Sequence, residues 1–177
     1  MCEYKKFLEE YTYQGDYDII ARIQNCDGSN ERENMDIVNS IVLWKVNRQV
    51  NIGKRLFTEI KQLQISDITE FKKKETAIKE IIEDLLNVKG VRIAMASTIL
   101  KMFYPNILPI IDQRAYRELY KTELPRHMKK QEYADVYIKY VYDCHNYYKQ
   151  CYRQIDFRDL DKVLYQMDID KGNKIHY

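Results

Sequence analysis

An aspartate stands where an apolar run meets the start of a predicted helix. Asp112 closes the run Leu-Pro-Ile-Ile and precedes the sequence Gln-Arg-Ala-Tyr-Arg-Glu-Leu-Tyr at residues 113–120. Asp is among the most effective N-caps, because its side chain accepts hydrogen bonds from the free amides of the first helical turn. Those amides also keep a carboxylate ionised at neutral pH, which suits a group that stabilises positive charge. Asp112 is therefore predicted to cap a helix, and a catalytic role is compatible with the cap.

A short turn containing glycine precedes this aspartate. The sequence Val-Lys-Gly-Val at 88–91 separates a predicted amphipathic helix, 75–86, from a predicted buried helix, 91–103, that contains small residues. Two helices joined by so short a turn form a helix-hairpin-helix unit, and small residues let their axes approach closely. The free amides at the start of the second helix are natural ligands for phosphate. A DNA backbone is one partner that fits.

The rest of the chain also predicts helices, because apolar residues recur at spacings of three and four. Helices are expected over 30–50, 112–120, 133–151 and 157–167, and Ser66 is a candidate cap for another. One apolar stripe is expected on the first of these helices, formed by Met35, Val38, Ile41, Val42 and Val46. No alternating pattern typical of strands is present. The sequence predicts an all-α protein of a single domain, or of two small lobes that share a core.

Composition limits the classes of protein that this chain can represent. It has 177 residues, a net charge of +2 and no apolar run long enough to span a bilayer, which predicts a cytoplasmic protein without a membrane partner. The four cysteines form no Cys-x-x-Cys pair, so neither a metal site nor a cofactor is expected. So small a net charge leaves the question of nucleic-acid binding open.

Tyrosine is unusually frequent, with 16 residues in the chain and seven of them between positions 133 and 152. Two interpretations remain open for this segment. The rings can form the wall and rim of the helical core, or they can offer surfaces on which bases stack.

The stretch from Glu75 to Tyr120 resembles the core motif of the helix-hairpin-helix-GPD superfamily of DNA base-excision glycosylases. In that superfamily a glycine hairpin is followed by an alanine-containing helix, a crossing rich in glycine and proline, and a catalytic Asp that opens the next helix. The corresponding parts here are VKGV at 88–91, AMAS at 94–97, the pair Pro105 and Pro109, and IIDQRAYREL at 110–119. The interval of 22 residues from Gly90 to Asp112 resembles that of endonuclease III-like members. The sequences WKVNR and FRDLDKVLYQ resemble segments of small bacterial members of this superfamily.

Three departures from the family pattern bear on chemistry. Arg92 replaces the second hairpin glycine, which exchanges a flexible backbone contact for a guanidinium at the same place. Ala94 occupies the position of the Schiff-base lysine of glycosylase-lyases, so amine chemistry is not expected. Cys144 and Cys151 have the spacing that begins an iron-sulfur pattern, but no further cysteine follows, so no cluster is expected.

The resemblance implies a two-lobed helical body that binds DNA and is a candidate monofunctional N-glycosylase, with Asp112 as its catalytic residue. It implies DNA contacts for the hairpin and the Asp-bearing helix, which here are Lys89, Gly90, Val91, Arg92 and Arg114. Trp44, Lys45 and Arg48 are candidates for the pocket of a flipped base, although Trp44 is more typical of a core residue and Lys45 and Arg48 are more typical of a solvated face. The alternative is a catalytically inactive helix-hairpin-helix module that binds nucleic acid or protein. Neither the base nor the oligomeric state follows from the sequence.

Overall fold

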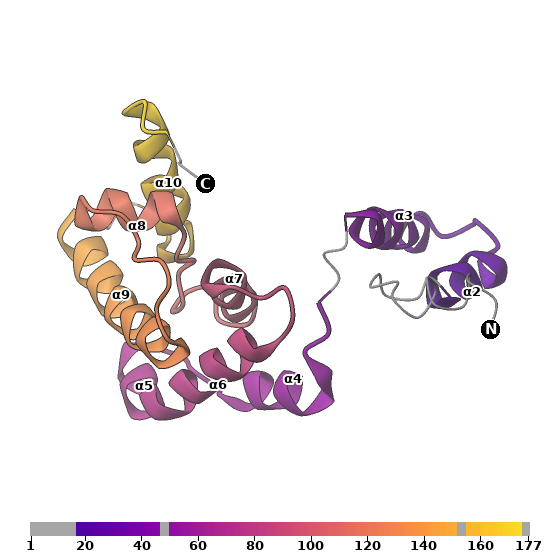
Figure 1. The fold of residues 1–177 in the computed structure, drawn as a ribbon, viewed down its shortest axis with the longest axis horizontal. Helices are drawn as coiled ribbons and strands as arrows, with labels where there is room; N and C mark the ends of the chain where they lie inside the picture. Colours follow the sequence, from indigo (N-terminus) through magenta and orange to yellow (C-terminus); the bar gives the residue numbers. More distant parts are fainter. Residues whose placement is uncertain (1–16, 47–49, 152–154, 175–177) are drawn as a thin grey trace, which may run out of the picture. The chain divides into compact units, whose positions relative to one another are not determined.

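The computed structural model of the protein describes residues 17–46, 50–151 and 155–174, and these residues are helical without a strand. The prediction of an all-α fold is confirmed. Figure 1 shows the elements, which in chain order are α2 (Tyr17–Asn25), α3 (Glu31–Lys45), α4 (Gly53–Gln62), α5 (Ile68–Lys73), α6 (Glu75–Asn87), α7 (Ile93–Phe103), α8 (Gln113–Tyr120), α9 (Lys130–Cys151), the 3-10 turn η1 (Phe157–Asp159) and α10 (Leu160–Asp170).

The chain divides into two compact units, Met1–Val50 and Asn51–Tyr177. In the first unit α2 packs against α3. Asn30 caps α3, because its side chain accepts hydrogen bonds from the amides of Arg32 and Glu33. The two-lobed arrangement implied by the family resemblance stays a prediction.

The apolar stripe expected on α3 is on the surface of the first unit. Met35 is 66% exposed and Val38 is 57% exposed, and the other three members of the stripe are exposed as well. The buried apolar residues of this unit are instead Ile19 and Ile37. The spacing of apolar residues therefore identified an apolar face of α3 correctly, but within the described residues that face is exposed and does not pack into a core.

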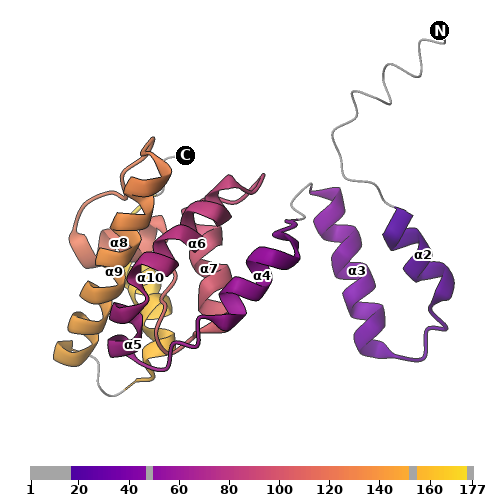
Figure 2. The same cartoon turned by 90° about the horizontal axis from the view of Figure 1, so that it is seen from below.

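The second unit is built around α6, which contacts α4, α5, α7 and α9, while α8 packs along α10 (Figures 1 and 2). Asp67 caps α5 by accepting hydrogen bonds from two amides, one residue after the predicted cap Ser66. The largest fully buried side chains come from α4, α5, α6, α7, α9, α10 and the segment before α8: Ile60, Phe71, Ile78, Ile82, Leu85, Leu100, Leu108, Ile111, Tyr137, Tyr140, Leu160 and Leu164. No helix within the described residues is both long and apolar enough to cross a membrane.

Candidate functional site

The second unit contains a cavity of about 960 Å³ beside the start of α8. Its walls come from the end of α6, the turn before α7, the first residues of α7 and α8, the segment between α8 and α9, the start of α9, and one side chain of α10. The lining residues are Leu86, Val91, Arg92, Ile93, Ala94, Asp112, Gln113, Arg114, Leu124, Pro125, Arg126, His127, Met128, Lys130, Tyr133 and Tyr165. The cavity is mainly apolar, with one carboxylate and several cationic side chains.

Asp112 is half-buried at the wall of this cavity. Its Oδ1 accepts a hydrogen bond of 2.8 Å from the amide of Ala115, so the predicted N-cap of α8 is confirmed. Burial raises the pKa of this carboxyl above its ordinary value, and the amide hydrogen bonds oppose that effect. We expected the amides to dominate, but desolvation is the larger influence.

The segment that leads to Asp112, residues 108–111, has no regular secondary structure and is held by the tyrosine-rich helix α9. The hydroxyl of Tyr137 donates to the carbonyl of Pro109, and that of Tyr140 donates to the carbonyl of Ile110, each at 3.1 Å. Both rings are fully buried, and burial raises the pKa of both hydroxyls, so they remain protonated donors. For these two tyrosines the interpretation as core material is confirmed.

A buried ion pair holds the same segment from the other side. Asp161 of α10 accepts a hydrogen bond of 2.7 Å from the amide of Ile110, and its carboxylate lies 2.5 Å from Nζ of Lys101 on α7. Lys101 also donates to the carbonyl of Arg158 at 2.7 Å. Since both ionised groups are buried and fully bonded, they fix the position of the backbone two residues before Asp112.

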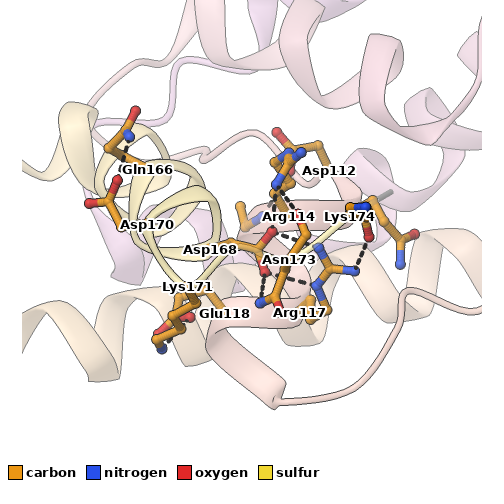
Figure 3. A network of polar contacts seen from close by, with 12 residues as sticks. Asp112, Arg114, Arg117, Glu118, Gln166, Asp168, Asp170, Lys171, Asn173 and Lys174 are labelled. Atoms are coloured by element: carbon orange, nitrogen blue, oxygen red, sulfur yellow. Dashed lines mark hydrogen bonds and ion pairs between the residues drawn. The ribbon is translucent and has the colours of Figure 1, made fainter. Parts of the chain in front are cut away.

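A second buried carboxylate anchors α8 to α10 (Figure 3). Asp168 is fully buried and accepts hydrogen bonds from Nε and Nη2 of Arg117, at 2.8 and 2.7 Å, and from Nη1 of Arg114 at 3.0 Å. A further hydrogen bond of 2.9 Å comes from the side chain of Asn173. The hydrogen bonds from Arg117, the largest influence, lower the pKa of Asp168 to about 2.

Arg114 therefore has a structural partner in addition to its predicted contact with DNA. Its guanidinium lies 5.6 Å from the ring centre of Tyr165, and its buried Nε has no hydrogen-bond partner among the described residues. Arg114 shares the carboxylate of Asp168 with Arg117, which also pairs with Glu123. The contact of Arg114 with DNA stays a prediction.

The residues of the turn between α6 and α7 differ in their exposure to solvent. Gly90 has a φ of 85°, which a glycine adopts without strain, and the amide of Val91 donates to the carbonyl of Val88 at 3.1 Å. Lys89, Gly90 and Arg92 are exposed, whereas Val91 is buried. Val91 thus closes the turn and lines the cavity, while the contact of Lys89, Gly90 and Arg92 with DNA stays a prediction.

The three aromatic and basic candidates near residue 45 belong to the other unit. Trp44 is half-buried and Lys45 is exposed at the C-terminal end of α3, while Arg48 lies outside the described residues. Their predicted role in the pocket stays a prediction.

Sequence reasoning missed the wall formed by residues 124–130. The run Leu-Pro-Arg-His-Met-Lys-Lys carries four basic side chains, and this clustering of charge was the signal that could have revealed it. Tyr133 and Tyr165 were also not expected to line the same cavity as Asp112.

In the part of the chain that the structure describes, no group of three or more His, Cys, Asp or Glu side chains is placed to hold a metal ion. Comparisons of the chain with models of protein families, with curated proteins and with solved structures found no match.

Proposed function

We propose that this protein binds DNA and hydrolyses the N-glycosidic bond of a base that has been flipped out of the duplex. The observation that carries the proposal is that Asp112 both caps α8 and lines a cavity. The residues Val91 and Arg92 of the predicted hairpin line the same cavity. A residue that served only as a cap would need no opening beside it. Ligand cavities of roughly 300–1,000 Å³ accept molecules of drug size, so a nucleobase fits within this one.

The chemistry requires stabilisation of a cation. When the bond between the sugar C1′ and the base nitrogen breaks, its electron pair leaves with the base and the sugar acquires oxocarbenium character. A carboxylate beside C1′ stabilises that charge, and it can accept a proton from the water whose oxygen then bonds to C1′. The departing base takes up a proton from solvent, which completes the hydrolysis.

The fixed backbone before Asp112 supports this role, because a charged group contributes most when its position needs no rearrangement. Tyr137 and Tyr140 hold the carbonyls of residues 109 and 110, while Asp161 holds the amide of residue 110. Side chains of α9 and α10 therefore hold one short segment directly, and Lys101 of α7 holds Asp161 in turn.

The decisive experiment compares base release by the unaltered protein and by Asp112→Asn on a panel of duplexes that contain damaged bases. Asn caps helices about as well as Asp, so the fold should persist while the negative charge is lost. We expect release to fall by roughly 10²- to 10⁴-fold. Asp67→Asn is the matched control, because Asp67 caps α5 and does not line the cavity. Equal rates in the unaltered and Asp112→Asn proteins would show that Asp112 is only a cap.

Borohydride trapping tests the absence of amine chemistry. Because Ala94 stands where glycosylase-lyases carry lysine, the product should be a free base and an intact abasic strand, without a covalent adduct. Lys101 is committed to Asp161, whereas Lys130 lines the cavity and bonds to Asn87. A trapped adduct that disappears in Lys130→Ala would assign the chemistry to that amine. DNA binding without base release would favour the inactive binding module.

A further inference from the structure

Two groups of cationic side chains occur on the second unit, and they differ in whether the protein itself neutralises them. Arg114 and Arg117 are bonded to the buried carboxylate of Asp168. In contrast, the side chains of Lys89, Arg92 and Lys129 have no hydrogen bond or ion pair within the part of the chain that the structure describes, and all three are exposed. The second group is therefore available to an external anion.

The members of the available group come from two segments that are distant in the sequence. Arg92 belongs to the hairpin, while Lys129 belongs to the segment between α8 and α9. Arg92 lines the cavity that contains Asp112, as do Arg126 and Lys130 beside Lys129. We define residues 125–130 as the basic segment; it contains Arg126, His127, Lys129 and Lys130, each of them exposed. Cationic walls from two elements thus border a single cavity.

The basic segment has a defined backbone. It is anchored at its start by the buried side chain of Leu124, and it turns at His127, which has a φ of 63°. The amide of Lys129 donates to the carboxylate of Glu132 at 2.6 Å, which is half of a capping box at the start of α9. These contacts hold the segment by its backbone. Its basic side chains are exposed, and Nζ of Lys130 also donates to the side chain of Asn87. A non-glycine residue in the left-handed region is a strained position, typical of functional segments.

We propose that the basic segment is a second contact surface for the DNA backbone, in addition to the hairpin. The inference rests on the proposed function, because a nucleotide that enters the cavity remains joined to phosphates on both its 5′ and 3′ sides. One exposed cationic segment on each wall gives each of these phosphates a partner. Such contacts position the strand and do not read its sequence.

The test measures the salt dependence of binding to a short labelled DNA duplex with a central abasic-site analogue. Two double variants each remove two positive charges: Lys89→Ala with Arg92→Ala in the hairpin, and Arg126→Ala with Lys129→Ala in the basic segment. The slope of log K against log salt should become shallower by about 0.9 for each phosphate that the variant no longer neutralises. We expect a similar change in both variants, an additive change in their combination, and an equal effect on all duplex sequences.

Lys61→Ala with Lys72→Ala is the charge-matched control, because both lysines are exposed on α4 and α5 and do not line the cavity. Thermal unfolding confirms that each variant is folded. If the basic-segment variant binds like this control while the hairpin variant loses affinity, the inference is wrong and the proposed function stands. Failure of the unaltered protein to bind DNA would overturn both.

Discussion

The helices on either side of Val50 use the same amphipathic pattern with different results. On α3 the apolar stripe that includes Val38 and Val42 is more than half exposed at both positions. On α6 the corresponding positions Ile78, Ile82 and Leu85 are completely buried. Periodicity reports which face of a helix is apolar, but burial depends on whether another element covers that face. Side chains of the same chemistry should therefore contribute very differently to stability in the two units.

The second unit also buries charge, and the largest loss of stability is expected there. Asp161→Ala leaves Lys101 buried without a counter-ion and the amide of Ile110 without an acceptor. Removing one partner of a buried ion pair should lower the free energy of unfolding by about 3–5 kcal/mol. Urea unfolding followed by circular dichroism measures the loss.

A neighbouring exposed pair is the control for that prediction. Asp159→Ala removes the partner of Lys162, whose side chain is 73% exposed, and should cost about 1 kcal/mol or less. If Asp161→Ala cost no more than Asp159→Ala, the pair with Lys101 would not be buried in solution. The polar contacts around Asp112 would then be weaker than the structure indicates.

Asp168 gives the next effect in size, and this effect depends on pH. Its pKa is about 2 in the folded protein and ordinarily 3.8, so the ionised form contributes about 2 kcal/mol to stability above pH 4. That contribution is lost as the pH falls from about 4 to 2, because the native carboxylate must then be protonated. Asp168→Asn should therefore destabilise the protein at pH 7 and much less near pH 2. An equal loss at both values, measured by urea unfolding, would exclude the ion pairs with Arg114 and Arg117 as its cause.

Local features of the sequence predicted local features of the structure well. A turn that contains Gly90 joins α6 to α7, Asp112 caps α8, and the helices on both sides of the turn at 88–91 have their expected places within two residues. Each of these features depends on chain neighbours, since a cap or a turn requires only the adjacent amides.

The long-range contacts of the site were not predictable in the same way. Asp161 lies three residues after Arg158, a spacing that favours an ion pair on a helix surface, and no spacing gives a signal for Asp168. Both carboxylates are instead buried partners of cations more than 50 residues away. The pairing depends on how α10 lies against α7 and α8, which no spacing within α10 encodes. For the same reason Tyr165 could not be assigned to the cavity, although its ring lies near Arg114.

The smallest effect is expected on the first unit, where it tests the comparison most directly. Val38→Ser combined with Val42→Ser replaces two apolar side chains that are 57% and 55% exposed, so the free energy of unfolding should change by about 0.5 kcal/mol or less. Ile37→Ser is the matched control on the same helix, because Ile37 is only 6% exposed and burial of such a side chain contributes about 1.5–3 kcal/mol. Hydrogen exchange of the α3 amides measures both changes locally. Loss of protection in the double variant as large as in Ile37→Ser would mean that the apolar face of α3 is covered in solution, and the contrast with α6 would then disappear.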